Sequence, residues 1–239
     1  MATDRPRLYI FPHAGGSTSF YVPFAKTFTI DVQRVAVQYP GTQRGRIHTT
    51  VPSITEMADN AYRMIVSAPE SDSPVVFFGH SMGALVAFEV ARRSEAAGRP
   101  VSALFVSSSS APALMHEQYF RDLSDDELMR FLIDLAGIDR KALDNKDFVE
   151  SMLPALRGYY DAIAGYTCAY GATVSCPIYA SVATDDNLAP YESVLAWSKH
   201  TTSEFAVRVF PGDHFYFTQH LPEVVHDIES RISEQGWHA

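Results

Sequence analysis

Residues 74–83 read Pro-Val-Val-Phe-Phe-Gly-His-Ser-Met-Gly, and residues 84–91 continue as Ala-Leu-Val-Ala-Phe-Glu-Val-Ala. The short apolar run Val75–Phe78 predicts a buried strand, and the longer run Ala84–Ala91 predicts a buried helix. Glycines at both ends of the intervening turn keep side chains out of a sharp reversal of the chain. A serine at the centre of that turn takes a strained backbone conformation and lifts its hydroxyl above the sheet, at a helix N-terminus that favours negative charge.

The G-x-S-x-G pattern between a strand and a helix is typical of the nucleophile elbow of α/β-hydrolases, with Ser81 as the predicted nucleophile. A chance match in a glycine-bearing turn is the alternative, and the flanking strand and helix disfavour it. Short apolar runs alternate with helical patterns along the chain, which predicts a mostly parallel central sheet flanked by helices. The predicted strands are Leu8–Phe11, Arg34–Gln38, Val75–Phe78, Ala103–Ser107, Ile178–Val182 and Phe205–Phe210. We therefore expect one α/β-hydrolase domain over residues 1–239.

One region interrupts the alternation of strands and helices. From about Ala111 to Thr173 only helical patterns occur, at Asp125–Leu135 and Asp147–Ile163. We interpret residues 111–173 as a helical lid insertion over the strand ends; a structural excursion on a sheet flank is the alternative. The lid's apolar positions either line a chamber or pack the lid onto the core, and packing is favoured for most of them: Leu128, Phe131, Leu132, Met152 and Leu156. Capping boxes at Ser53–Glu56 and Ser124–Glu127, and Pro222 in a first turn, mark helix starts.

Composition excludes several classes of protein. The chain has 239 residues, 46% hydrophobic and 20% charged, as in an ordinary globular enzyme. A net charge of −9 without a Lys/Arg cluster argues against nucleic-acid binding. Cys168 and Cys176 have neither C-x-x-C spacing nor paired histidines, so two reduced thiols in a cytoplasmic protein are expected. The N-terminus leaves no room for a signal peptide, no apolar run approaches bilayer length, and no metal or cofactor is expected.

A serine hydroxyl needs a base to become a nucleophile, and the base needs a carboxylate partner, in the chain order Ser, Asp/Glu, His. His214 follows the last predicted strand through a Pro-Gly-Asp turn, which is the strand end where the base of such enzymes lies. Asp185 and Asp186 follow the preceding strand directly. Adjacent residues on an extended segment point in opposite directions, so one of them orients His214, and spacing alone does not decide which. Asp213 is expected to be a turn residue.

Two backbone N–H groups are needed to stabilise an oxyanion. The N–H of Met82, just after the predicted nucleophile, supplies one. The loop Pro12-His-Ala-Gly-Gly16 supplies the other, with Ala14 as the predicted donor. Among the remaining histidines, His80 is expected to face away from the Ser81 hydroxyl. Four others are expected to be solvated: His200, His220, His226 and His238.

Several motifs, in order, resemble the type II thioesterases, stand-alone editing hydrolases of polyketide synthases and nonribosomal peptide synthetases. They are Phe11-Pro-His-Ala-Gly-Gly16, Tyr39-Pro-Gly41, Gly79-His-Ser-Met-Gly83, Ala87-Phe-Glu89, Ala196-Trp197 and Gly212-Asp-His-Phe215. The resemblance runs from about Leu8 to Ile228. It is closest to actinobacterial members, through Tyr21-Val-Pro-Phe-Ala25 and Ser175-Cys-Pro-Ile-Tyr179.

The resemblance implies hydrolysis of acyl thioesters on the phosphopantetheine arms of acyl or peptidyl carrier proteins, with the synthase as partner. It also implies that the second aspartate of a G-D-x-D-like segment, here Asp186, orients the histidine. Two departures stand out: Val182-Ala-Thr184 lacks that segment's glycines and first aspartate, and the family's Pro-Gly-Arg is Pro40-Gly41-Thr42 here. Arg44 or Arg46 could replace the lost arginine, and substrate preference is not carried over.

Two other functions are compatible with the same residues. One is a small-molecule carboxylesterase or lipase, because the predicted triad does not by itself distinguish thioesters from oxoesters. The other is a catalytically idle binding partner of a synthase, which the complete Ser, Asp, His set argues against.

Overall fold

The structure is a computed structural model that describes residues 5–39, 51–68, 73–115, 124–135, 141 and 144–235. Its centre is a six-stranded sheet of order β2-β1-β3-β4-β5-β6, in which every neighbouring pair is parallel. The strands are β1 (Arg7–Phe11), β2 (Gln33–Ala36), β3 (Val75–His80), β4 (Ala103–Ser107), β5 (Ile178–Ala183) and β6 (Phe205–Phe210). All six predicted strands are confirmed. β2, at the edge of the sheet, ends two residues before its predicted end.

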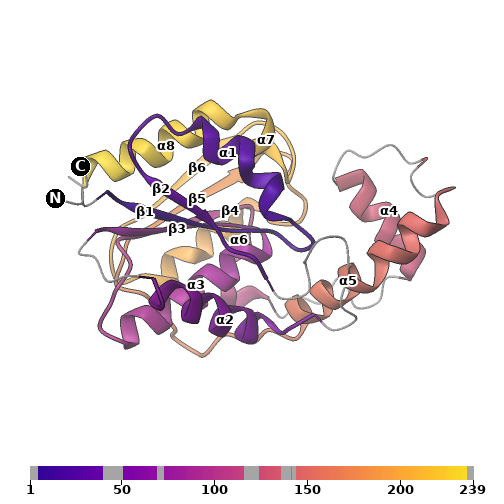
Figure 1. Ribbon diagram of the computed structural model, residues 1–239, viewed down its shortest axis with the longest axis horizontal. Coiled ribbons are helices and arrows are strands. Elements are labelled where there is room, and N and C mark those ends of the chain that lie inside the picture. The colour runs from indigo at the N-terminus through magenta and orange to yellow at the C-terminus, as the bar shows by residue number, and fades with distance from the viewer. Residues whose placement is uncertain are drawn as a thin grey trace.

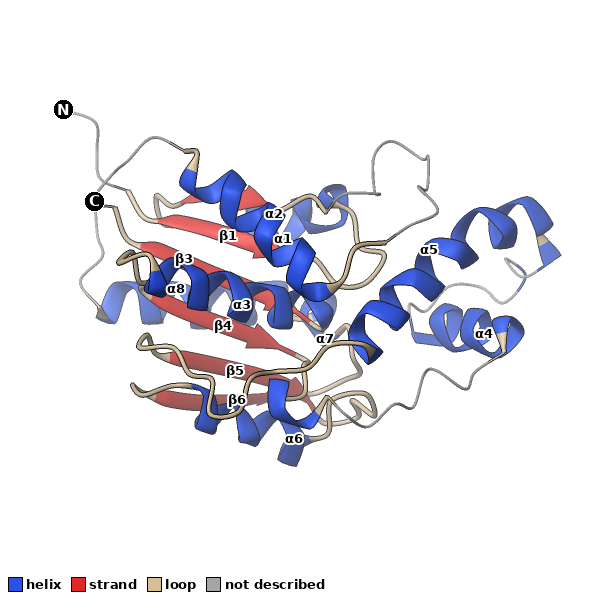
Figure 2. Cartoon of the chain, turned by 90° about the horizontal axis from the view of Figure 1, so that it is seen from below, coloured by secondary structure: helices blue, strands red, loops and turns tan. Residues whose placement is uncertain are grey.

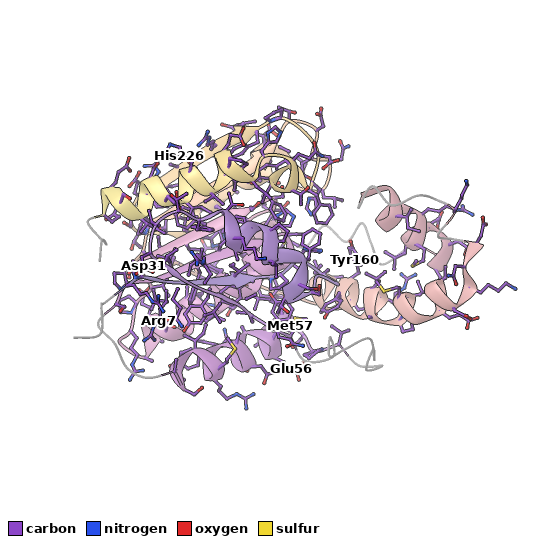
Figure 3. The ribbon with its side chains drawn as sticks, turned by 45° about the horizontal axis from the view of Figure 1, so that its top comes forward. Arg7, Asp31, Glu56, Met57, Tyr160 and His226 are labelled. Atoms are coloured by element: carbon purple, nitrogen blue, oxygen red, sulfur yellow. The ribbon has the colours of Figure 1, made fainter. Side chains whose placement is uncertain are left out.

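Helices cover both faces of this sheet (Figure 1). One face carries α1 (Val22–Thr27), α7 (Tyr216–Gln219) and α8 (Leu221–Glu234), and the other carries α2 (Ile54–Val66), α3 (Met82–Ala96) and α6 (Tyr191–Leu195). In Figure 3 the labels Met57, on α2, and His226, on α8, mark these opposite sides. Short 3-10 helices are η1 (Thr18–Tyr21), η2 (Pro112–Leu114) and η4 (Ala196–His200). Two layers of helix around a parallel sheet make this an α/β fold.

The pleat of β1 divides the core in two. Leu8 and Ile10 pack with α1 and α8 on one face, while Tyr9 and Phe11 pack with α2 and α3 on the other. This is the alternation that an extended chain imposes when both faces of its sheet are buried. Both predicted capping boxes are formed, each by reciprocal side-chain to backbone hydrogen bonds. Ser53 pairs with Glu56 at the start of α2, and Ser124 pairs with Glu127 at the start of α4 (Asp125–Leu135).

Among the described residues, the two α-helices between β4 and β5 are α4 and α5 (Lys146–Ala164). They project beyond the end of the sheet to which the strand arrows point (Figure 2). Their facing surfaces form a small apolar cluster of their own, built on Met129, Ile133 and Leu156. Arg157 of α5 also donates to Asp125 of α4 at 2.7 Å. We call these two helices the α4–α5 pair.

The five apolar positions singled out in this insertion fall into three groups. Leu156 and Met152 pack within the cluster of the α4–α5 pair, and Leu128 is fully buried. The side chains of Phe131 and Leu132 lie outside the described residues. Leu156 also reaches the main body, because a Cβ built on Gly15 would lie 3.1 Å from its Cδ2. Packing is therefore a role of Met152 and Leu156, as expected. Over the described ranges, none of the helices combines the length and apolar character that crossing a bilayer requires.

Candidate active site

Ser81 occupies a strained turn between β3 and α3. Its φ of 54° and ψ of −125° lie in a region that residues other than glycine rarely adopt. The turn is held from the side, since the Ser81 N–H donates to the carbonyl of Ser107 at 2.8 Å. Ser81 is also the N-cap of α3, so its side chain lies at the positive end of a 15-residue helix.

Two glycines make this turn possible by leaving space for backbone. A Cβ on Gly79 would lie 2.5 Å from the carbonyl oxygen of Gly83. A Cβ on Gly83 would lie 2.0 Å from the carbonyl oxygen of Phe11, at the end of β1. The first turn of α3 is thus packed directly against the start of the loop that carries Ala14. Glycine is therefore required at both positions of the G-x-S-x-G pattern because a Cβ there would collide with backbone atoms.

A small cavity of about 60 Å³ lies above the elbow. Four predicted site residues line it together: Ala14, Ser81, Met82 and His214. The α4–α5 pair contributes Tyr160 and Ile163 to the same wall. Tyr160, labelled in Figure 3, lies on α5 where that helix meets the main body. The insertion therefore contributes side chains to the wall of this cavity.

His214 is buried and contacts Asp186. Its Nδ1 lies 3.0 Å from each oxygen of the Asp186 carboxylate. Oδ1 of that carboxylate also accepts the backbone N–H groups of Leu188 and Ala189, at 3.0 and 3.1 Å. Burial raises the pKa of Asp186, but the hydrogen bond to His214 and the charge of that imidazole outweigh burial and leave the pKa below its usual value. The carboxylate is therefore ionised at neutral pH and accepts a hydrogen bond from the Nδ1–H group of His214.

The neighbouring acids point elsewhere. Asp185 is exposed and accepts a hydrogen bond from the Thr184 hydroxyl at 3.0 Å. Asp213 accepts the N–H of Phe215 at 2.9 Å, which makes it the turn residue that was expected. Of the two aspartates after β5, Asp186 is the one in contact with His214.

The two predicted oxyanion donors line the same cavity as Ser81. Met82 is the first residue of α3, where a backbone N–H has no intrahelical acceptor. Ala14 lies in a turn closed by the hydrogen bond from Gly16 N–H to the carbonyl of His13, at 2.9 Å. Gly15, with a φ of 75°, provides the left-handed residue of that turn.

Three imidazoles gather at this end of the sheet. The ring centre of His80 lies 5.0 Å from that of His214 and 5.9 Å from that of His13. Burial, and then the charge of His214, lowers the pKa of His13 to about 3. The same two causes, together with His13, hold the pKa of His80 well below 6.5. His13 and His80 are therefore neutral at physiological pH.

The expectation of a solvated His200 is wrong. His200 is 4% exposed, and its Nδ1 donates to the carbonyl of Ala172 at 2.8 Å while Nε2 accepts the N–H of Ala113 at 3.4 Å. One neutral ring thus bridges both ends of the insertion, a role that sequence position on a helix could not reveal. His226 is exposed and His220 half-buried, while His238 lies outside the described residues.

Sequence reasoning missed the serines after β4 as part of the cavity wall. Ser108, Ser109 and Ser110 line the cavity, and Ser108 has the second non-glycine positive φ of the described residues, 46°. The hydroxyl of Ser108 lies beside Asp186 and contributes to lowering the pKa of that carboxyl, though it makes no well-formed hydrogen bond. The run of four serines at residues 107–110, directly after a strand, was the available signal.

Within the described part of the chain, no group of three or more His, Cys, Asp or Glu side chains is arranged to hold a metal ion. A parallel sheet with a strained serine turn after β3, an aspartate after β5 and a histidine in contact with it after β6 defines the chain as an α/β-hydrolase.

The chain belongs to the thioesterase domain family, whose model matches residues 6–232. It is 46% identical over 230 residues to the thioesterase TesA of Mycobacterium marinum, which covers 96% of this chain and 92% of the relative. It is 34% identical to the thioesterase PikA5 of Streptomyces venezuelae, over 95% of this chain and 80% of the relative. Among solved structures, the type II thioesterase BorB from the borrelidin biosynthetic cluster superposes with a TM-score of 0.81 at 36% identity, covering 96% of this chain and 93% of that one. Membership of this family makes the chain a thioester hydrolase, as the sequence motifs predicted.

Proposed function

We propose that this protein is a serine thioesterase that hydrolyses acyl groups from the phosphopantetheine arms of carrier proteins, and so edits stalled polyketide or nonribosomal peptide intermediates. The observation that carries the proposal is the single cavity that brings Ser81, His214, Met82 and Ala14 together, with Asp186 behind the imidazole. The relatives support the pathway: BorB and YbtT are described as type II thioesterases, YbtT from the yersiniabactin pathway.

In the proposed first step, the Ser81 Oγ attacks the thioester carbonyl and its proton passes to Nε2 of His214. Nε2 is the free nitrogen because Nδ1 faces Asp186. The oxyanion accepts hydrogen bonds from the N–H groups of Met82 and Ala14, and these backbone donors are fixed in place and need no reorientation during the reaction. The C–S bond then breaks, and His214 returns the proton to the departing thiol.

In the second step, a water attacks the acyl ester on Ser81. His214 takes the water proton, the same two N–H groups hold the new oxyanion, and the C–O bond to Ser81 breaks. The proton goes back to Ser81, and a carboxylic acid leaves. Asp186 stays ionised throughout and stabilises the imidazolium, as its lowered pKa favours.

The α4–α5 pair is proposed to act as a lid over this cavity. Tyr160 and Ile163 contribute its outer wall, so the pantetheine arm and the acyl chain have to pass beside α5. The carrier protein and its synthase are the proposed partners. The cytoplasm is the proposed location, where reduced thiols such as the free Cys168 and Cys176 persist.

The test is release of a short acyl group from a purified acyl-carrier protein, followed by mass spectrometry of the carrier. The parent protein should release the acyl group and react with a fluorophosphonate at Ser81. Ser81→Ala should lose both while keeping its fold, with turnover lower by roughly 10⁴-fold or more. Labelling that persists in Ser81→Ala would identify another nucleophile.

A carboxylesterase is the alternative enzyme, and the same preparation tests it. A carrier-borne thioester and its matched oxoester are compared at equal concentration. Preference for the thioester supports the proposal, and preference for the oxoester supports the alternative. A protein that binds the synthase but releases no acyl group from either substrate would be the idle partner.

A further inference from the structure

A chain of buried hydroxyl groups lies behind the three imidazoles. His80 Nδ1 is 3.0 Å from the Ser107 hydroxyl, Ser107 Oγ is 2.8 Å from the Tyr216 hydroxyl, and Tyr216 donates to Ser181 Oγ at 2.6 Å. His80, Ser107 and Tyr216 are fully buried. The chain joins the ends of three neighbouring strands to Tyr216, which is two residues after His214.

The direction of the protons in this chain follows from counting them. Tyr216 has one hydroxyl proton and gives it to Ser181, so in the contact with Ser107 it is the acceptor. Ser107 therefore gives its own single proton to Tyr216. The contact between Ser107 and His80 can then be made only if Nδ1 of His80 carries a proton and donates it.

This count fixes the tautomer of His80. Nδ1 is protonated, and Nε2, which is buried without a hydrogen-bond partner among the described residues, is a bare acceptor. An unprotonated Nε2 is an unpaired buried acceptor. A proton on Nε2 as well would make it an unpaired buried donor on a charged ring, which costs more free energy. The lowered pKa of His80 agrees with this state.

We propose that His80, Ser107 and Tyr216 are positioning residues for His214, and that their one-directional chain fixes the loop at residues 212–216 while holding His80 neutral. The inference rests on the proposed function, in which His214 is the base. Tyr216 anchors the loop through its two hydrogen bonds and its stacking on Phe210, at 4.9 Å between ring centres. A neutral ring 5.0 Å from His214 adds no positive charge beside the imidazole when that imidazole takes up a proton.

The tautomer is tested directly by long-range ¹⁵N–¹H correlation spectra of the enzyme labelled at histidine nitrogens, with His80 assigned from the spectrum of His80→Asn. The expected result is a protonated Nδ1 and an unprotonated Nε2 at neutral pH. A protonated Nε2 would overturn the proposal, and this measurement needs no variant to be active.

Positioning is tested with Tyr216→Phe, which keeps the ring and removes the hydroxyl. We expect kcat to fall about tenfold with KM unchanged, less than the roughly 100-fold that a 1 Å displacement of reacting groups costs. The rate of fluorophosphonate labelling at Ser81, counted per active site, should fall by the same factor. Tyr179→Phe is the matched control, because it removes a hydroxyl bonded to Glu204 near the start of β5. His80→Asn, which keeps an N–H near the position of Nδ1, should retain more activity than His80→Leu.

The outcomes separate the two proposals. If Ser81→Ala remains active, the proposed function fails. If the parent is active and labelled at Ser81 while Tyr216→Phe matches it in kcat and labelling rate, only the positioning role fails. A loss shared equally by Tyr216→Phe and Tyr179→Phe would reduce the effect to stability and also overturn it.

Discussion

Replacing Asp186 by asparagine would separate the charge of this side chain from its shape. Oδ1 accepts two backbone N–H groups, from Leu188 and Ala189, and the oxygen of an asparagine would keep that place. The new NH₂ group would then occupy the position of Oδ2, 3.0 Å from Nδ1 of His214. Two donors facing each other at that contact disfavour a proton on Nδ1, although the retained Oδ1 also lies 3.0 Å from it. The change therefore shifts the imidazole toward the tautomer with its proton on Nε2, the nitrogen that should accept from Ser81.

The expected cost follows from this tautomer. A triad with the histidine in the wrong tautomer loses roughly 10⁴-fold in kcat. At about 1.4 kcal/mol for each factor of ten, that is about 5.5 kcal/mol of transition-state stabilisation. Stability should also depend on pH. The folded-state pKa of Asp186 is lowered, so its carboxylate stabilises the fold above the unfolded pKa of about 3.9, and this contribution is lost as pH falls through the lower folded value.

The assay is release of free thiol from an acyl thioester, read continuously with a disulfide dye, alongside urea unfolding at neutral pH and near pH 3. Asp185→Asn is the matched control, because its exposed side chain contacts Thr184 and not His214. A comparable loss in both variants, or a larger one in Asp185→Asn, would refute the reasoning. So would a stability difference for Asp186→Asn that grows as the pH falls.

Three further predictions concern other parts of the site. Gly83→Ala, with its Cβ 2.0 Å from the Phe11 carbonyl, should lower the free energy of unfolding by ~3 kcal/mol or more; Gly98→Ala, which meets nothing within 4 Å, should cost only the ~1–2 kcal/mol of its positive φ, and equal losses in urea melts would contradict this. His13 has a folded pKa of about 3, so below about pH 6.5 the unfolded chain binds a proton at His13 that the folded chain does not bind. The free energy of unfolding should therefore fall by up to ~1.4 kcal/mol for each unit by which the pH is lowered from 6.5 to 4. The lowered pKa of His80 adds a slope of the same sign, so His13→Gln should reduce the slope without abolishing it, and an unchanged slope would assign it to other groups. If the α4–α5 pair is a lid, its amides should exchange with deuterium faster than those of β3; equal protection would make it a rigid cap.

The sequence was sufficient for the parts of this fold that depend on local pattern. All six strands follow from short apolar runs because a parallel sheet buries both faces of its strands. α4 has its predicted bounds, since the capping box at Ser124 marks its start. The elbow follows from Gly79 and Gly83, whose requirement for space is a property of the turn itself.

The remainder depends on contacts between distant segments. Spacing left Asp185 and Asp186 equivalent, and what distinguishes them is the turn at Leu188 and Ala189, whose N–H groups hold one carboxylate against His214. His200 was expected in solvent because nothing local indicates that Ala113 and Ala172 converge on it. Tyr160 could not be assigned to the cavity, because helical periodicity identifies a buried face but not what that face covers.

The internal apolar cluster of the α4–α5 pair has a consequence for how these enzymes diversify. Met129 and Ile133 pack against Leu156 within the pair. The two connections between the pair and the main body, at Ala113 and Tyr166, are fixed separately by hydrogen bonds to His200 and Glu89. A segment that has its own apolar cluster, and whose two connections are held by residues outside that cluster, can be exchanged as a unit. Exchanging the residues between Ala113 and Tyr166 for those of a relative would replace the outer wall of the cavity and leave the proposed catalytic residues unchanged. Acyl preference could in this way be inherited, or engineered, independently of the chemistry.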